Sequence, residues 1–212
     1  MLTNRKVKAQ ATRQMILDNA EDVFLETGLS GASLEEIAKC CGVTRGAIYW
    51  HFKNRGEVFE AVFERTVSFY ENLLVDITQK ANSLKEFEDF TTDLLKRIAS
   101  DRKRQRALCI LLLRHEWLPS EPKIIAASRE SNARTLRVIV DFFTRMQASG
   151  QLSDMVPTKI MAEACLFYMQ GLIGQFLRHP EAVNLKKNAQ NYTRLFFNAL
   201  DMAEPQKKGG KS

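Results

Sequence analysis

The sequence has few of the residues that enzymes and metalloproteins need. Its three histidines, His51, His115 and His179, lie far apart, and none has a carboxylate or cysteine at metal-ligand spacing. Glu116 follows His115 directly, but adjacent side chains on a helix point in different directions. The sequence also contains no phosphate-binding loop and no nucleophile motif. We therefore expect no catalytic activity, no metal and no cofactor.

Cysteine is also scarce, with four occurrences at Cys40, Cys41, Cys109 and Cys165. These positions match no zinc spacing, and the adjacent pair would form a poor structural disulfide. We interpret all four as reduced thiols that serve as small apolar side chains in a cytoplasmic protein. The alternative, a redox-sensing role for Cys40 or Cys41, stays open.

Long apolar runs are lacking too, so we expect no transmembrane helix, no secretory signal and no membrane partner. Glycine and proline are few, at 10 and 5 residues. Hardly any window alternates polar and apolar residues as a strand does, whereas helical spacing recurs, which predicts an all-α fold of about nine helices.

The expected helices are short at the N-terminus and longer beyond it, which predicts a small head over residues 1–55 and a larger body over 56–203. Glycine, proline and capping residues mark their ends, the clearest being the capping box of Ser33 and Glu36. The tail at 204–212, EPQKKGGKS, is expected to be disordered. The predicted helices cover residues 8–27, 33–41, 44–51, 56–77, 84–99, 103–117, 123–148, 157–179 and 184–203.

Residues 33–52, SLEEIAKCCGVTRGAIYWHF, have the pattern of a helix-turn-helix. Ala38 is small enough to let two helices touch, and Gly42 can take the left-handed conformation that the turn needs. Thr44 is placed to cap the second helix. Apolar anchors for that helix stand at Ile37, Val43 and Ile48. The pattern predicts a DNA-binding head.

If Ile48 and Phe52 face inward, the opposite face of the second helix is exposed and suits the major groove. Arg45 is long enough for a bidentate contact to guanine, and Tyr49 offers a ring to a thymine methyl group. Residues 1–13 contain no acidic side chain, so their basic residues can neutralise phosphates. The predicted DNA-binding set is Ser33, Thr44, Arg45, Gly46, Tyr49, His51, Lys53 and Arg13.

Structural alternatives exist for part of this head. We expect Trp50 to pack between head and body rather than to contact bases. His51 has the same alternative, besides a phosphate contact or a helix-capping role. The basic arm could equally be a solvated tail.

Residues 33–53, above all VTRGAIYWHFKN, resemble the DNA-binding head of the TetR family of bacterial repressors, in its AcrR-like branch. The similarity extends back through TRQMILDNAEDVFLETGLSGASLEEIA, and GLIGQFLRHPEAVNLKKNAQNY resembles the C-terminal region of that branch. The resemblance implies a homodimeric repressor that leaves its operator when a small, often hydrophobic, ligand occupies the body. Many AcrR-like members control multidrug efflux genes. By position, the resemblance places DNA contacts at Thr44, Arg45, Gly46, Tyr49, His51 and Lys53.

The body carries more apolar residues than one face of each helix requires. Methionine and aromatic side chains suit an adaptable apolar pocket, although plain core packing explains the same stripes. Gln170 stands in an apolar stretch and needs a partner, which is a ligand, the dimer partner or the backbone. The predicted ligand-binding set is Phe87, Phe90, Leu94, Leu108, Leu111, Leu112, Trp117, Leu166, Met169, Gln170 and Ile173.

The last two helices are the expected dimer interface. Gly171 and Gly174 lie inside a predicted helix, where each costs about 1 kcal/mol relative to alanine, so close packing against a partner helix would explain them. Pairing with their copies about a two-fold axis would form a four-helix bundle. The alternative is that the same faces pack within one chain. The apolar stripe of the last helix is Leu185, Ala189, Tyr192, Phe196 and Leu200.

A net charge of +6 and a pI of about 9.2 favour a polyanionic partner. Together these features predict a cytoplasmic, ligand-responsive repressor that binds a palindromic operator in double-stranded DNA as a dimer. We expect it to control a multidrug efflux operon and to be released by a small hydrophobic inducer. The alternative is a DNA-binding regulator without an efflux role, or an activator, whose body serves only dimerisation.

Overall fold

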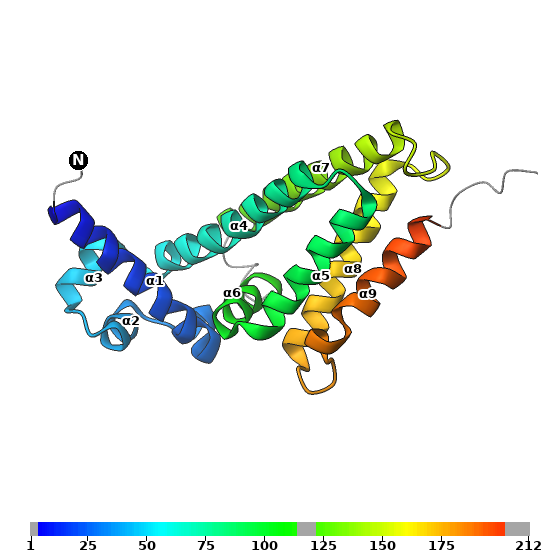
Figure 1. Ribbon diagram of the computed structural model, residues 1–212. Helices are drawn as coiled ribbons and strands as arrows, with labels where there is room; N and C mark the ends of the chain where they lie inside the picture. The colour runs from blue at the N-terminus through cyan, green and yellow to red at the C-terminus, as the bar shows by residue number, and fades with distance from the viewer. Residues whose placement is uncertain (1–3, 114–121, 202–212) are drawn as a thin grey trace, which may run out of the picture. The chain divides into compact units, whose positions relative to one another are not determined.

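The computed structural model describes residues 4–113 and 122–201, and each regular element within these residues is an α-helix. The nine helices of this part of the chain are drawn in Figure 1. They are α1 Asn4–Gly31, α2 Leu34–Cys41, α3 Arg45–His51, α4 Arg55–Lys80, α5 Leu84–Ser100, α6 Arg102–Leu113, α7 Pro122–Ala148, α8 Thr158–Arg178 and α9 Leu185–Asp201. The predicted all-α fold is confirmed.

Local capping chemistry sets the ends of the short helices. The Ser33 hydroxyl accepts a hydrogen bond from the Glu36 N–H at 3.1 Å and opens α2. The Thr44 hydroxyl accepts one from the Ala47 N–H at 3.2 Å and opens α3. Between them, Gly42 ends α2 at φ 67°, in the left-handed region that glycine adopts without strain. These predicted boundaries are confirmed.

The sequence also predicted the ends of three longer helices, α1, α6 and α9. α1 reaches Gly31 rather than residue 27, but Gly28 at φ 71° and ψ 172° interrupts it, so the predicted stop is present as a kink. At the start of α9 the Asn184 side-chain oxygen accepts a hydrogen bond from the Lys187 N–H at 3.1 Å, as expected of a cap. The predicted extension of α6 to residue 117 and the tail at 204–212 lie outside the described residues.

The chain divides into two compact units, and two of the helices, α4 and α7, contribute residues to both. The first unit comprises Met1–Phe69 and Arg102–Arg129, and the second comprises Tyr70–Asp101 and Glu130–Ser212. The functional division into residues 1–55 and 56–203 stays a prediction.

The first unit joins α1 to its neighbours through both apolar and ionic contacts. Phe24 of α1 meets Phe59 of α4 edge to face, with ring centroids 5.3 Å apart. Asp18 of α1 pairs with Arg65 of α4 at 2.8 Å and with Lys103 of α6 at 3.0 Å. Burial alone raises the pKa of the Asp18 carboxyl, but Lys103 and Arg65 together hold it below its usual value. α1, which leads into the helix-turn-helix, is therefore tied to two other helices.

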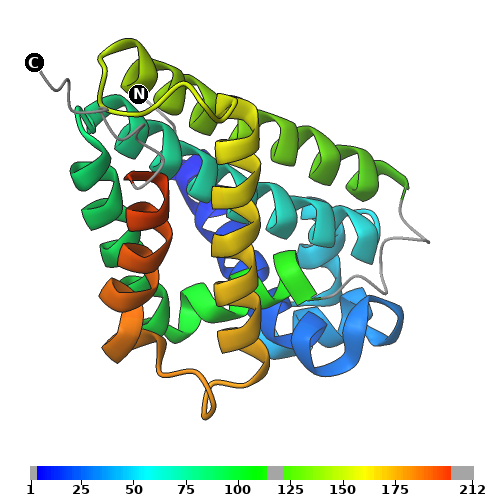
Figure 2. The same cartoon turned by 90° about the vertical axis from the view of Figure 1, so that its right-hand side faces the viewer.

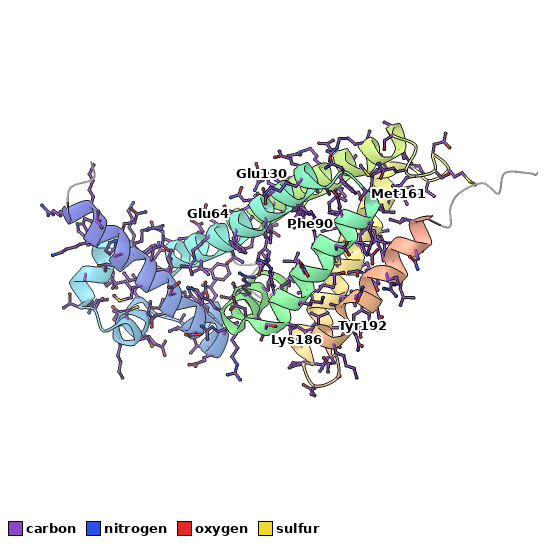
Figure 3. The ribbon with its side chains drawn as sticks, viewed as in Figure 1. Glu64, Phe90, Glu130, Met161, Lys186 and Tyr192 are labelled. Atoms are coloured by element: carbon purple, nitrogen blue, oxygen red, sulfur yellow. The ribbon has the colours of Figure 1, made fainter. Side chains whose placement is uncertain are left out.

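The core of the second unit contains aromatic rings that pack against one another. α5 lies along α9, and α8 lies beside α9, as both views show (Figures 1 and 2). Phe90, Met161 and Tyr192, labelled in Figure 3, come from α5, α8 and α9 respectively. The Thr92 and Thr193 hydroxyls are hydrogen-bonded at 2.6 Å and join α5 to α9 in the buried interior. The rings at the centre of the unit belong to Phe87, Phe142, Phe143 and Phe197.

α8 is long and apolar enough to cross a membrane by length and composition. The expectation that the sequence contains no stretch long and apolar enough to cross a membrane is therefore wrong. However, 33% of its most apolar window is buried inside the chain, and Met161, Ala162 and Cys165 belong to the core. A helix that supplies one face to a protein core passes the same test.

Helical spacing places Phe69 on the same side of α4 as Val58 and Val62, but Phe69 is 48% exposed whereas the two valines are buried. Thr66 and Val67, between Val62 and Phe69, are buried as well. The spacing of apolar residues therefore does not by itself decide which of them another helix covers.

Candidate nucleic-acid interface

The packing of α3 determines which of its side chains stay exposed. Ile48 and Phe52 are buried in the core of the first unit, as the sequence predicts. The Val43 N–H donates to the Ala38 carbonyl oxygen at 3.0 Å and closes the turn that leads into α3. With one side of this short helix anchored, its other side is open to solvent. The exposed positions of the predicted set are Thr44, Arg45, Gly46, Tyr49 and Lys53.

Arg45 and Tyr49, one helical turn apart on α3, converge on a carboxylate of α2. The Tyr49 hydroxyl donates a hydrogen bond to Glu35 Oε1 at 2.9 Å, and Arg45 Nη2 lies 3.2 Å from the same oxygen. The Arg45 guanidinium also lies over the Tyr49 ring, 5.4 Å from its centroid. Glu35, Arg45 and Tyr49 form what we term the α2–α3 polar cluster.

The charges in this cluster remain accessible to a partner. The side chain of Arg45 is 74% exposed and that of Glu35 is 48% exposed. A hydrogen bond from its own backbone N–H, and then the Tyr49 hydroxyl, hold the pKa of the Glu35 carboxyl below its usual value. Glu35 is therefore ionised at neutral pH, and its contacts with α3 are charge-assisted.

Gly46 is exposed on α3 and lies between Arg45 and Tyr49 in the sequence. A methyl group added at Gly46 would meet no atom of the described residues within 4 Å. Packing inside the chain therefore gives no reason for glycine at this position. Close approach of another molecule to the backbone of α3 would give one.

Basic and imidazole groups flank the end of α3. The Arg13 guanidinium of α1 lies over the ring of Phe52, 5.1 Å from its centroid. Lys53 is exposed, and its backbone N–H donates to Glu57 Oε2 at 2.8 Å. Burial, and secondly the charge of Arg13, lower the pKa of His51 below 6.5, so its imidazole is neutral at pH 7 in the free protein.

Ser33 differs from the rest of the predicted DNA-binding set. It is half-buried, and its hydroxyl oxygen already accepts the hydrogen bond that caps α2. A Ser33 hydroxyl can still donate its own proton to a phosphate while it accepts that bond. Its contact with DNA stays a prediction.

Two residues with exposed side chains were missed or misassigned from sequence. Trp50 is 68% exposed, so the expectation that it packs between two parts of the protein is wrong. Two residues along a helix turn through about 200°, so Trp50 points away from the side on which Ile48 is buried. Glu35 was not selected, because an acidic residue in the first turn of a helix is explained by the helix dipole alone.

The predicted ligand-binding residues are distributed over both units. Phe87 packs against three other phenylalanines, so core packing accounts for it. Ile173 is buried as well, whereas the others in the second unit are half-buried: Phe90, Leu94, Leu166, Met169 and Gln170. In the first unit Leu108 is buried, and Leu111 and Leu112 are half-buried. Trp117 lies outside the described residues. Their role in ligand binding stays a prediction.

The apolar residues of the last two helices, α8 and α9, include both buried and exposed side chains. Leu185 and Ala189 of the predicted α9 stripe are buried within this chain, and the Tyr168 hydroxyl donates to the Tyr192 carbonyl oxygen at 2.8 Å. Leu185 and Ala189 therefore pack inside the chain, which was the alternative interpretation, whereas Tyr192, Phe196 and Leu200 are half-buried and their part in a dimer stays a prediction. Leu195, on another face of α9, is 69% exposed.

α8 presents an apolar stripe that stays exposed among the described residues. Ile160 and Phe167 are seven residues apart and Gly171 follows four residues later, so all three lie on one side of the helix. Phe167 is 64% exposed, and a methyl group added at Gly171 would meet nothing within 4 Å. We term Ile160, Phe167 and Gly171 the exposed α8 stripe.

Comparison with known proteins gives consistent matches along the chain. The family model for bacterial regulatory proteins of the tetR family matches residues 16–62. The HTH-type transcriptional regulator SrpR of Pseudomonas putida is 36% identical over 173 residues, which is 82% of this chain and 76% of SrpR.

Two solved structures resemble the whole fold. NalD, the secondary repressor of the MexAB-OprM multidrug efflux pump in Pseudomonas aeruginosa, has a TM-score of 0.78 and 27% identity, covering 91% of this chain and 97% of NalD. The SmeT–triclosan complex has a TM-score of 0.80 and 26% identity, covering 89% of this chain and 91% of SmeT.

Proposed function

Since the chain belongs to the TetR family of bacterial regulatory proteins, in its AcrR-like branch, we propose that it is a ligand-responsive transcriptional repressor. It binds a palindromic operator in double-stranded DNA as a homodimer, and hydrophobic small molecules release it. Its target is a multidrug efflux operon, in keeping with the efflux-pump repressor NalD and the triclosan-bound SmeT.

The observation that carries this proposal is the exposed side of α3. Its buried anchors hold the helix firmly, while Arg45 and Tyr49 project from the other side. Among the described residues Arg45 makes one ion pair, through Nη2, and a guanidinium has five N–H donors, so a bidentate contact to guanine O6 and N7 stays available. Tyr49 supplies a ring for a thymine methyl group.

The flanking residues suit the phosphate backbone. Lys53 and Arg13 are cationic, and the Thr44 hydroxyl can reach a phosphate while it caps α3. His51 is neutral in the free protein, and a neighbouring phosphate would favour its protonation. The half-buried Ser33 at the start of α2 completes the proposed set.

A palindromic operator requires two copies of α3 related by a two-fold axis. Successive major grooves on one side of DNA are about 34–36 Å apart, so a dimer must present its recognition helices at that spacing. The exposed α8 stripe and Leu195 of α9 offer uncovered apolar surface on the last two helices. We place the dimer interface there, since a second copy would bury this surface.

The ligand is a small hydrophobic molecule held among apolar residues of the body. Phe90, Leu166 and Met169 of the predicted set are half-buried, so a ligand can still cover part of their apolar surface. The amide of Gln170 can orient the ligand by a hydrogen bond. A ligand that binds one dimer state better than the other shifts the population between them. α4 is one continuous helix with residues in both units, so it is the element we propose to carry this shift.

Selection of bound duplexes from a random DNA pool by the full chain tests the proposal. The expected result is an enriched inverted repeat, and triclosan added to the complex should then weaken binding to it. Absence of any enriched sequence would overturn the DNA-binding proposal. If triclosan and other hydrophobic probes bind the protein without changing its affinity for the selected duplex, the body serves dimerisation alone.

A further inference from the structure

The α2–α3 polar cluster places a carboxylate on the side of the head that we propose meets DNA. Glu35 is ionised, its side chain is 48% exposed, and its Oε1 lies 3.2 Å from Arg45 Nη2. DNA is a polyanion, so a negative charge at this position opposes binding to every duplex, whatever its sequence. We therefore expect Glu35 to offset this loss of affinity by helping the protein to distinguish one DNA sequence from another.

We propose that Glu35 is a specificity-determining residue that positions Arg45 and Tyr49 for base contacts and discourages Arg45 from contacting phosphate. This inference rests on the proposed function of α3 in DNA binding. Glu35 acts through its two partners on α3, so it is a positioning residue.

The first effect of Glu35 is to order its two partners before DNA binds. Arginine has a long, flexible side chain, and ordering it on binding costs conformational entropy. In this structure the ion pair with Glu35 and the stacking over Tyr49 already order the guanidinium before DNA arrives. The hydroxyl of Tyr49 is held by the same oxygen, Glu35 Oε1, so both side chains are set relative to one another.

The second effect of Glu35 depends on the charge of the acceptor that Arg45 meets on DNA. Guanine O6 and N7 are neutral acceptors, so Arg45 can use its remaining donors on them and keep its contact with Glu35. A phosphate oxygen that approaches the same guanidinium is negatively charged and is repelled by the Glu35 carboxylate. The carboxylate therefore penalises the phosphate contacts that dominate binding to unrelated DNA more than it penalises base contacts.

The test compares Glu35→Gln with Glu36→Gln in the full chain. Both substitutions remove one negative charge from the first turn of α2, so their effects on the helix dipole are alike. Only Glu35→Gln removes the carboxylate that contacts Arg45 and Tyr49. The probes are a duplex selected by the wild-type protein and a scrambled duplex of equal length and composition, and thermal unfolding verifies that each variant is folded.

The expected result is a loss of discrimination. For Glu35→Gln the affinity for the scrambled duplex rises more than that for the selected duplex, and their ratio falls about three- to tenfold. For Glu36→Gln both affinities rise together and the ratio changes by less than about twofold. Equal changes in the two variants would mean that Glu35 acts by charge alone, and this proposal would then be overturned.

A double-substitution cycle with Tyr49→Phe sharpens the test, because this change removes only the hydroxyl that Glu35 accepts from. If Glu35 works through its partners, its substitution changes the ratio less in the Tyr49→Phe background than in the wild type. Strictly additive effects would contradict the proposal. A wild-type protein that selects no duplex at all would instead overturn the proposed function on which this inference rests.

Discussion

The aromatic core of the second unit and the exposed side of α3 in the first unit use aromatic side chains in opposite ways. In that core the rings are interior, with Phe87 in contact with Phe142 at a centroid distance of 4.4 Å. In the first unit Tyr49 and Trp50 are exposed on α3. Charged residues also have a structural role there, since Asp18 joins α1 to Arg65 and so links two helices.

This difference shows which side chains contribute to stability and which are available for recognition of a partner. A side chain that fills the interior contributes to the free energy of unfolding through burial, so its loss damages the whole unit. A side chain that projects from an anchored helix contributes little to stability and remains free for a partner. Substitutions on the exposed side of α3 should therefore change binding alone, and substitutions in the aromatic core of the second unit should change stability first.

The largest expected effect is on the stability of the second unit. Phe142 is fully buried against the rings of Phe87 and Phe143, so Phe142→Ala should lower the free energy of unfolding by about 3–5 kcal/mol. Trp50→Ala removes an exposed aromatic side chain of the first unit and should change stability by less than about 0.5 kcal/mol. Urea denaturation followed by circular dichroism measures both. Similar losses for the two variants would abolish the contrast between the units.

The next largest effect concerns the exposed α8 stripe. Phe167→Glu puts an unpaired charge where we propose that a second copy packs, and should weaken the dimer by about 2–4 kcal/mol. Sedimentation velocity over a range of protein concentrations would then show monomer where the wild type is dimeric. Asn132→Glu, which adds the same charge at an exposed position on α7, is the control. A fully dimeric Phe167→Glu protein would place the interface elsewhere.

Arg45→Ala should weaken binding to the selected duplex by about 1–3 kcal/mol, since it removes a base-contacting guanidinium, and should leave the unfolding transition unchanged. Fluorescence anisotropy at fixed salt concentration gives the affinity. Arg137→Ala removes the same charge from an exposed position on α7 and should have little effect. Equal losses for the two variants would mean that Arg45 contributes only net charge.

The smallest effect is on thiol reactivity and distinguishes buried from exposed cysteines. Burial raises the pKa of Cys165 to about 12, so its thiol stays protonated and should not react with a disulfide reagent at pH 8. Because the folded-state pKa exceeds 9.0, this group's contribution to stability is complete below pH 9 and declines as pH rises toward 12. Exposed Cys40 should react first. Fast modification of Cys165 in the native protein would contradict its burial.

Helix ends were predictable because their causes are local. Ser33, Thr44 and Asn184 each bond to a backbone N–H three residues further on, and Gly42 adopts its left-handed turn conformation at the predicted position. The inward side of α3 was predictable for a similar reason. Ile48 and Phe52 are four residues apart, so they lie on one side of a helix whatever packs against them.

Contacts between helices were not predictable in the same way. Glu35 precedes Tyr49 by 14 residues, and its hydrogen bond depends on how α2 and α3 pack across the turn. The α9 stripe was equally compatible with a dimer surface and with packing inside the chain, and only the structure shows that Leu185 and Ala189 are buried while Tyr192, Phe196 and Leu200 are half-buried. Phe69 shares a side of α4 with buried Val58 and Val62 and is nevertheless 48% exposed, because spacing along a helix does not specify where a neighbouring helix covers it.

The sequence by itself determined the helical class, the caps, the turn and the presence of an exposed polar and aromatic surface on α3. These features depend on backbone propensity and on contacts within a few residues, which are encoded where they occur. Tertiary structure alone decided that Trp50 is exposed, that Glu35 holds Arg45 and Tyr49, and that Phe167 is left uncovered. Each of these depends on which helix covers which face, and a helical period specifies the direction of a side chain but not the neighbour it meets.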